Sequence, residues 1–226
     1  RGLAGRNGEL EVCATGGHAA GWPPRSTDPG STTLAIDPTL LDDLEWRGLI
    51  AHSTDLDALR AALAEGSVRF YVGFDPTAPS LHMGNLVQIL TAKRLQEAGH
   101  TPYALVGGAT GMIGDPSGKS DARKLLSVET LQRNVAGLER QMRQFLDFES
   151  GERAARLVNN WDWMHGWSYL EFLRDVGKNF PVNVMLAKDS VQTRLERGLS
   201  FTEFSYMLLQ AYDFWHLHRT EGCELQ

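Results

Sequence analysis

A loop at residues 75–85 carries polar side chains at a place where α/β proteins bind phosphate. It reads Asp-Pro-Thr-Ala-Pro-Ser-Leu-His-Met-Gly-Asn and joins a predicted buried strand at 68–74 to a predicted helix. Free N–H groups and the helix dipole attract anions at such a junction. Thr77 and His82 can donate to phosphate oxygens, and Gly84 lets a base or ribose approach the backbone. We interpret the loop as a phosphate site rather than as a proline-stiffened turn with a capping histidine.

A second loop, Gly107–Lys119, is dense in glycine and follows the next predicted strand. Its glycines fit neither the Walker A spacing nor the dinucleotide fingerprint, in which a glycine triplet opens a helix. Long loops of this composition between core elements are more often functional than idle. We therefore expect it to be functional; the alternative is a flexible surface loop.

The last predicted helix carries three polar residues on one face. Tyr206, Gln210 and Asp213 are spaced i, i+4 and i+7, so their side chains share a stripe. Ser200 and Glu203 have the spacing of a capping box at the start of this helix. A phenol, an amide and a carboxylate on one stripe form either a recognition surface or a solvated helix face, and the spacing leaves both interpretations open.

Apolar runs of strand length alternate with amphipathic segments of helix length, which predicts a mostly parallel sheet wound in the Rossmann manner. The predicted strands cover 68–74, 103–106, 156–158 and 223–226. The predicted helices cover 38–49, 55–65, 83–98, 127–145, 168–176, 184–197 and 201–218. The predicted fold class is thus α/β with a Rossmann-like parallel sheet.

Residues 1–37 differ in composition from the rest of the chain. They are rich in Gly, Pro, Ser and Thr and lack apolar periodicity. Such a segment buries too little apolar surface to offset its ordering entropy, so we expect a disordered or artefactual extension before a domain at 38–226. The formal net charge is -6, so the overall balance gives no sign of a nucleic-acid partner, although a local basic patch would suffice for RNA.

The cysteines and the hydropathy bear on the compartment. Cys13 and Cys223 are far apart and fit no metal-ligand spacing, which favours unpaired thiols in a reducing environment. No apolar run reaches the length of a transmembrane helix. We therefore expect a cytoplasmic protein with no protein-bound metal and no membrane partner.

The segment Phe70–Asn85 resembles the His-Ile-Gly-His signature region of class I aminoacyl-tRNA synthetases. Together with Gly107–Lys119 and Ser200–Phe214, it makes the chain similar to the bacterial tyrosyl-tRNA synthetases over about Leu40–Gln226. The resemblance implies that the α/β fold is a nucleotide-binding catalytic domain with a helical insertion, incomplete at its C-terminal end. It further implies activation of L-tyrosine with ATP and Mg²⁺, transfer to tRNA(Tyr), a homodimer and no tightly bound cofactor. In this chemistry a carboxylate attacks the α-phosphate, so catalysis needs positioned donors and no covalent enzyme intermediate.

The resemblance also assigns roles to residues at matching positions. It implies that the ATP phosphates are contacted by Thr77, His82, Lys119 and Arg123. The residues that it assigns to the amino-acid substrate are Tyr71, Asp115, Tyr206, Gln210 and Asp213. Those that it assigns to the rest of ATP are Gly73, Asp75, Gly84 and Asn85. It implies weaker site roles for Asn160 and Asp162 and a dimer-interface position for Phe201.

The sequence departs from the family pattern in several places. Asn85 replaces the second histidine of the signature, although its amide can still donate to a ribose oxygen, and Val72 replaces a polar residue of some relatives. No Gly-Gly-Ser-Asp-Gln segment follows Gln226, and no loop like Lys-Met-Ser-Lys-Ser is present. We therefore expect a fragment that lacks the second ATP loop and the anticodon-binding region, and that does not turn over alone.

Three other functions compete with tyrosine activation. A tryptophan-specific relative is disfavoured by the Tyr71–Asp213 pair, because an indole offers one donor and no acceptor. A nucleotidylyltransferase with a similar loop is disfavoured by the polar stripe on the last helix. A non-catalytic fragment that binds tyrosine or a partner subunit stays open, since the second ATP loop is missing.

Overall fold

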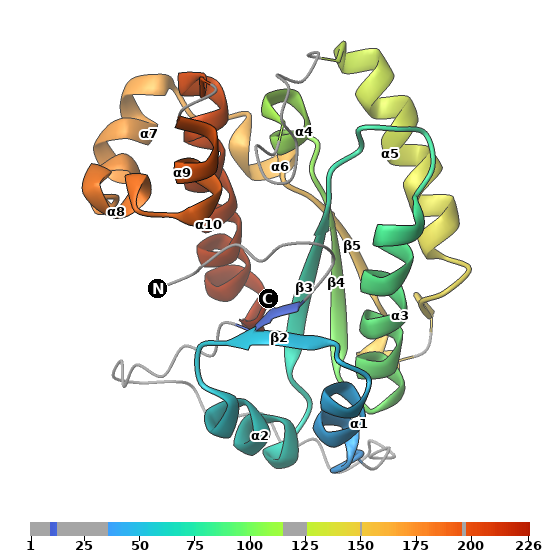
Figure 1. Cartoon of the computed structure of the whole chain (residues 1–226). Helices are drawn as coiled ribbons and strands as arrows, with labels where there is room; N and C mark the ends of the chain where they lie inside the picture. Colours follow the sequence, from blue (N-terminus) through green and yellow to red (C-terminus); the bar gives the residue numbers. More distant parts are fainter. Residues whose placement is uncertain (1–9, 13–35, 115–125, 150, 196–197) are drawn as a thin grey trace.

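A parallel four-stranded sheet organises the computed structural model, which describes residues 10–12, 36–114, 126–149, 151–195 and 198–226. Its strand order is β5-β4-β3-β6, and all three pairings are parallel (Figure 1). The strands are β3 (Arg69–Phe74), β4 (Thr101–Val106), β5 (Arg156–Asn159) and β6 (Cys223–Leu225). The four strands predicted from the sequence and the α/β fold class are confirmed.

Alternate residues of the central strands face two different cores. Phe70 and Phe74 of β3 pack with α3 and α5, whereas Tyr71 packs with Tyr103 of β4 and Leu217 of α10. Figure 1 accordingly places α3 and α5 on one side of the sheet and α10 on the other. A strand covered on both faces is apolar along its whole length, which is why β4 is buried at every position.

The helices largely follow the predicted pattern. They are α1 (Leu40–Trp46), α2 (Leu56–Glu65), α3 (Met83–Glu97), α4 (Thr110–Ile113), α5 (Val128–Met142), α6 (Trp161–Met164), α7 (Tyr169–Asp175), α8 (Val182–Leu186), α9 (Asp189–Leu195) and α10 (Phe201–Glu221). Two 3₁₀ turns cover Gly151–Arg153 and Gly177–Asn179. The capping box of Ser200 and Glu203 is present at the start of α10, and the left-handed Gly222 (φ 66°) ends that helix.

Two predicted helices are wrong in extent. The helix predicted at 38–49 ends at Trp46, because Gly48 adopts φ 68°, and Ile50–Ser53 forms strand β2 instead. The helix predicted at 184–197 is divided into α8 and α9. The Gln192 side chain donates to the Leu186 carbonyl at 2.6 Å, so it satisfies a group at the end of α8 that a continuous helix would use.

A short strand, β1 (Leu10–Val12), pairs in parallel with β2. It lies inside the predicted extension at 1–37, for which the sequence pattern predicts no strand. The other described residues of that extension are 36–37, where the Asp37 N–H donates to the Ala98 carbonyl at 3.2 Å. Residues 1–9 and 13–35 lie outside the described part of the chain.

None of the described helices combines the length and the apolar character that crossing a membrane requires.

His100 occupies a buried position just before β4. It is 0% exposed, and its Nδ1 accepts a hydrogen bond from the Val68 N–H at 3.1 Å. An accepting Nδ1 fixes the neutral tautomer with the hydrogen on Nε2. Burial and, to a smaller extent, the charge of Arg153 lower the pKa of His100 to about 4. Protonation would charge a buried ring and break its hydrogen bond with Val68, the residue before β3.

We expect His100 to make folding sensitive to acid. Because its pKa is lower in the folded chain than in the unfolded chain, its contribution to stability is complete above the unfolded value of about 6.5 and falls with pH toward 4. A pKa shift of this size corresponds to about 3 kcal/mol in the free energy of unfolding. Urea unfolding between pH 4 and 7.5 measures it, with His100→Asn as the control that keeps an acceptor near the Nδ1 position. Wild-type and His100→Asn curves of equal slope against pH would contradict the expectation.

Candidate active site

Segments that follow three parallel strands meet α10 at one end of the sheet. The loop after β3 begins at Asp75, the glycine-rich loop begins at Gly107 after β4, and Asn160 follows β5. In Figure 1 this end of the sheet lies beside α4, α6 and the middle of α10. The carboxyl ends of parallel strands are where α/β sheets bind ligands. The two loops and the helix stripe predicted to be functional are thus brought together.

Asp213 is a buried carboxylate on α10. It is 2% exposed and accepts hydrogen bonds from Asn160 Nδ2 at 2.9 Å and Trp163 Nε1 at 2.8 Å. Burial raises the pKa of Asp213 to about 7, against the opposing effect of these two bonds and with a smaller contribution from the charge of Asp75. The carboxyl is therefore poised between its two protonation states near neutral pH. A solvated helix face is excluded for this residue.

Asn160 connects this carboxylate to the glycine-rich loop. It is 0% exposed, and its Oδ1 accepts from the Ala109 N–H at 2.8 Å. Its Nδ2 donates both to Asp213 Oδ2 and to Thr110 Oγ1, the latter at 3.0 Å. Both N–H directions of this amide and its oxygen are bonded within the protein, so it links the end of β5 to α4 and α10. Asp162, the other weak candidate, lies exposed on α6.

Asp75 forms the next link of the network. Its Oδ1 accepts from Thr110 Oγ1 at 2.8 Å, and its Oδ2 accepts from the Tyr206 hydroxyl at 3.1 Å. A Cβ at Gly107 would overlap both Asp75 Oδ1 and Thr110 Oγ1. Glycine is therefore required at this position by the close approach of two side chains, not by an unusual backbone angle.

Tyr71 belongs to the same buried region. It is 3% exposed in β3, and its ring lies 6.0 Å from that of Phe214, the residue after Asp213. Trp163 packs against this cluster and hydrogen-bonds to Asp213. Gln210 is half-buried between Tyr206 and Asp213 on α10. Tyr71 and Asp213 therefore lie in one polar aromatic region, and Tyr206 is linked to it through Asp75.

Trp163 is a site residue that the sequence reasoning missed. Its helix, α6, has a single turn, so no periodic pattern marks the face that it presents. The only available signal was its position close to Asn160, in a segment rich in amide, carboxylate and indole side chains.

His82 caps the N-terminus of α3. Its Nδ1 accepts from the N–H groups of Gly84 at 3.1 Å and Asn85 at 3.3 Å, while Asn85 Oδ1 accepts from the His82 N–H at 3.2 Å. With Nδ1 as an acceptor, the neutral ring carries its hydrogen on Nε2, which can donate outward. The capping role and a donor role are therefore compatible. His82, Gly84 and the nearby Thr77 are all exposed.

Three predicted site residues lie outside the described part of the chain: Asp115, Lys119 and Arg123. The described part of the glycine-rich loop runs to Gly114 and includes the short helix α4. Gly73 is exposed on β3. No group of three or more His, Cys, Asp or Glu side chains that could hold a metal ion occurs among the residues that the structure describes.

The C-terminal end of α10 is anchored to three strands through Glu221. The Glu221 carboxylate accepts from the Tyr103 hydroxyl at 3.0 Å and lies 3.5 Å from Arg156 Nη1, while its carbonyl accepts from Arg69 at 2.8 Å. Burial and the bond to Glu221 raise the pKa of Tyr103 to about 12, so this phenol stays neutral. The anchor fixes the position of α10 along the sheet, and with it the position of Asp213.

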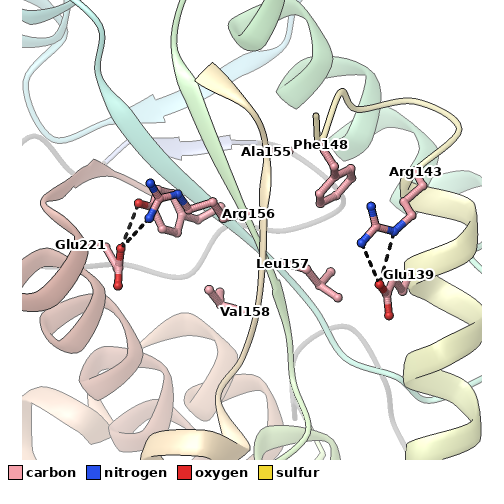
Figure 2. Close-up of a pocket in the computed structure, with 9 residues that line it drawn as sticks. Glu139, Arg143, Phe148, Ala155, Arg156, Leu157, Val158 and Glu221 are labelled. Atoms are coloured by element: carbon pink, nitrogen blue, oxygen red, sulfur yellow. Dashed lines mark hydrogen bonds and ion pairs between the residues drawn. The ribbon is translucent and has the colours of Figure 1, made fainter. Parts of the chain in front are cut away.

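A cavity of about 590 Å³ adjoins this anchor. Figure 2 shows β5 between the lining residues, with Arg156 and Glu221 on one side of the strand and Arg143, Glu139 and Phe148 on the other. None of the predicted site residues lines this cavity, and both arginines are paired with carboxylates. We therefore place the active-site chemistry at the ends of the strands and not here.

The geometry offers two adjoining chemical environments. One is a buried region in which a carboxyl group, a phenol and an indole can select a polar aromatic ligand. The other is the exposed start of α3, where the His82 ring can donate its Nε2–H to an anion and the helix dipole adds to the attraction. A molecule held in the first environment could present its reactive group to a phosphate in the second.

Comparison with known proteins agrees with this arrangement. The family model "tRNA synthetases class I (W and Y)" matches residues 63–226. The chain is 59% identical over 197 residues to a tyrosine--tRNA ligase of Rhodopirellula baltica, which covers 86% of this chain and 45% of that protein. It is 61% identical over 189 residues to a tyrosine--tRNA ligase of Streptomyces coelicolor, which covers 83% of this chain and 44% of that protein.

A solved structure shows the same fold. The C-terminally truncated mitochondrial tyrosyl-tRNA synthetase of Aspergillus nidulans matches with a TM-score of 0.73 at 34% sequence identity, over 81% of this chain and 55% of that chain. The chain spans less than half of the length of the two curated relatives above. Since the family model covers well over half of the chain, the chain belongs to the class I tRNA synthetases of the W and Y family.

Proposed function

We propose that this chain is the tyrosine-activating part of a tyrosine--tRNA ligase, which joins L-tyrosine to ATP as tyrosyl-adenylate and then transfers the tyrosyl group to tRNA(Tyr). The observation that carries the proposal is the buried Asp213, held by Asn160 and Trp163 at the end of the sheet. A phenol both donates and accepts a hydrogen bond. The Asp213 carboxylate accepts a hydrogen bond from the phenol O–H, and the Tyr71 hydroxyl donates a hydrogen bond to the phenol oxygen.

This pair of contacts explains how the site selects tyrosine. Phenylalanine would leave Asp213 and Tyr71 buried without their ligand partners, which is strongly unfavourable; tyrosyl-tRNA synthetases are the standard example of this kind of rejection. Tryptophan offers an indole N–H but no acceptor for Tyr71. At the other end of the substrate, Tyr206, Gln210 and Asp115 bind the ammonium and carboxylate groups.

The phosphate side of the reaction falls to the loop between β3 and α3. The tyrosine carboxylate attacks the α-phosphate in line, the bond from that phosphorus to the bridging oxygen of the β-phosphate breaks, and pyrophosphate leaves; no covalent enzyme intermediate is formed. Thr77 and the Nε2–H of His82 donate to phosphate oxygens as negative charge moves onto them, and Lys119 and Arg123 close on the pyrophosphate. The nucleoside is contacted by Gly73, Asp75, Gly84 and Asn85. ATP enters with Mg²⁺, which shields the phosphate charge.

The remaining functions of a ligase are assigned to sequence outside this chain. The second ATP loop and anticodon recognition belong there, in keeping with the 45% of the Rhodopirellula baltica relative that the chain covers. Residues 1–37 are a dispensable extension. A cytoplasmic location is supported by Cys223, whose buried thiol is free.

A homodimer is supported by apolar side chains exposed on the helices after β5. Exposed apolar patches of this kind mark protein interfaces. Phe201, at the start of α10, is 65% exposed, and Leu170 on α7 is 76% exposed. Further exposed apolar residues of these helices include Tyr169, Leu173, Val182, Val184, Leu186 and Leu195.

The function is tested by pyrophosphate exchange in the full-length protein with tyrosine, tryptophan and phenylalanine in turn. We expect exchange to depend on tyrosine, because only a phenol satisfies both Asp213 and Tyr71. Isothermal titration of the 226-residue chain with the three amino acids is the matched binding experiment, since the chain contains the described substrate residues. Exchange driven best by tryptophan would overturn the substrate assignment.

Tyrosine binding should also depend on pH through Asp213. In the empty site its carboxyl has a pKa of about 7, and the phenol adds a third donor that favours the ionised form. The affinity should therefore rise with pH by up to about tenfold per unit below 7 and level off above it. Titration calorimetry of the chain between pH 5 and 8.5 measures this dependence. Asp213→Asn should bind weakly and without this slope; an unchanged slope in that variant would assign the titration to another group.

The dimer is tested with Phe201→Asp in the full-length protein, because a buried charge at an interface centre has no partner. We expect the dissociation constant of the dimer to rise at least about thirtyfold, the effect of losing an interface contact of about 2 kcal/mol. Analytical ultracentrifugation provides the measurement. Trp46→Asp is the matched control, since Trp46 is 80% exposed on α1, and it should leave the dimer intact. Equal effects of the two substitutions would argue against a dimer interface formed by the exposed apolar residues of α7 to α10.

A further inference from the structure

One face of α5 contacts the loop that carries Thr77 and His82. Three residues of this helix, Asn134, Gly137 and Gln141, are spaced i, i+3 and i+7 and so lie on one side of it. Each of them meets a different backbone group of the loop. Figure 1 shows the chain leaving β3, crossing to α5 and turning back into α3.

The two outer contacts are hydrogen bonds to the loop backbone. Asn134 is 4% exposed, and its Nδ2 donates to the Pro76 carbonyl at 2.9 Å. Gln141 Oε1 accepts from the Leu81 N–H at 2.7 Å. One contact lies just before Thr77 and the other just before His82. The two side chains therefore fix the backbone on both sides of the exposed donors.

The middle contact depends on the absence of a side chain. A Cβ at Gly137 would overlap the Pro79 carbonyl oxygen. Because that neighbour is backbone, a side chain here would displace the loop itself. Gly137 lies inside α5, where glycine is a poorer helix former than alanine. Helix stability alone does not explain a glycine at this position, but the close approach of the loop does.

We propose that Asn134, Gly137 and Gln141 are positioning residues for amino-acid activation: they set where Thr77 and His82 stand relative to the ATP phosphates. The inference rests on the proposed function. The substrate side of the site is built by other elements, with Asp213 on α10 and Asn160 after β5. A displaced loop should therefore slow the chemistry and leave tyrosine binding in place.

A pair of neighbouring substitutions separates this role from helix stability. Gly137→Ala favours the helix, but its Cβ displaces the loop backbone at Pro79. Ala136→Gly weakens the helix at an exposed position that faces away from the loop. In the full-length protein, Gly137→Ala should lower the kcat of tyrosine-dependent pyrophosphate exchange by about a hundredfold, the typical effect of a displacement of about 1 Å. Its KM for tyrosine should stay near the wild-type value, and Ala136→Gly should keep the wild-type kcat.

A second experiment reads the loop directly and needs no catalysis. Hydrogen exchange of the Leu81 amide is measured by NMR in the 226-residue chain. Gln141→Met removes the acceptor and should make this amide exchange faster, whereas Gln141→Glu keeps an acceptor oxygen and should restore protection. Arg140→Ala, on the exposed side of α5, is the control and should change nothing.

The outcomes distinguish this inference from the proposed function. A wild-type protein without tyrosine-dependent exchange would contradict the proposed function, while Leu81 exchange would still test the contact with α5. The inference is overturned if Gly137→Ala keeps the wild-type kcat, or if it raises the KM for tyrosine in proportion to the loss of rate. Equal protection of the Leu81 amide in Gln141→Met and Gln141→Glu would overturn it as well.

Discussion

Asp213 places a carboxyl group where almost no water reaches it, and the surrounding site is built to satisfy that group. Burial of an unpaired carboxylate is strongly unfavourable, so such groups need hydrogen-bond donors. Asn160 supplies one from the segment after β5, and Trp163 supplies one from α6. A hydrogen bond tolerates little displacement of its donor. The two bonds to Asp213 therefore fix the segment after β5 and α6 relative to α10. Under the proposed function, a phenol that enters the site supplies a further donor and is selected for that reason.

Asn160 connects Asp213 to the rest of the site through further hydrogen bonds. Its amide also bonds Ala109 and Thr110, and Thr110 in turn bonds Asp75, which accepts from Tyr206 back on α10. The chain of bonds thus begins and ends on α10 and passes through the loops after β3, β4 and β5. The hydrogen bond between Thr110 and Asp75 depends on the small size of Gly107, since a side chain at that position would separate the two residues.

The sequence was sufficient for the framework and for part of this network. Strand and helix alternation, and the stripe that carries Tyr206 and Asp213, follow from periodicity, which the chain itself records. The role of Asn160 does not follow from periodicity, because its partners lie about fifty residues away along the chain. Strand β2 was missed because three leucines before Gly48 continue a helical pattern, and a single left-handed glycine outweighs it. Contacts across the sheet thus decided what local patterns could not.

Asn85 illustrates how a departure in sequence can be resolved by structure. It stands where the signature of the family has its second histidine, and its amide was expected to serve a ribose. In the structure its Oδ1 accepts from the His82 N–H, and its own backbone N–H donates to the His82 ring. The pair closes the start of α3 and points the Nε2–H of His82 outward. Asn85 therefore helps to orient the His82 ring. Under the proposed function, the affinity for the amino acid and the rate of its activation depend on different parts of the fold, the first on α10 and the second on the start of α3.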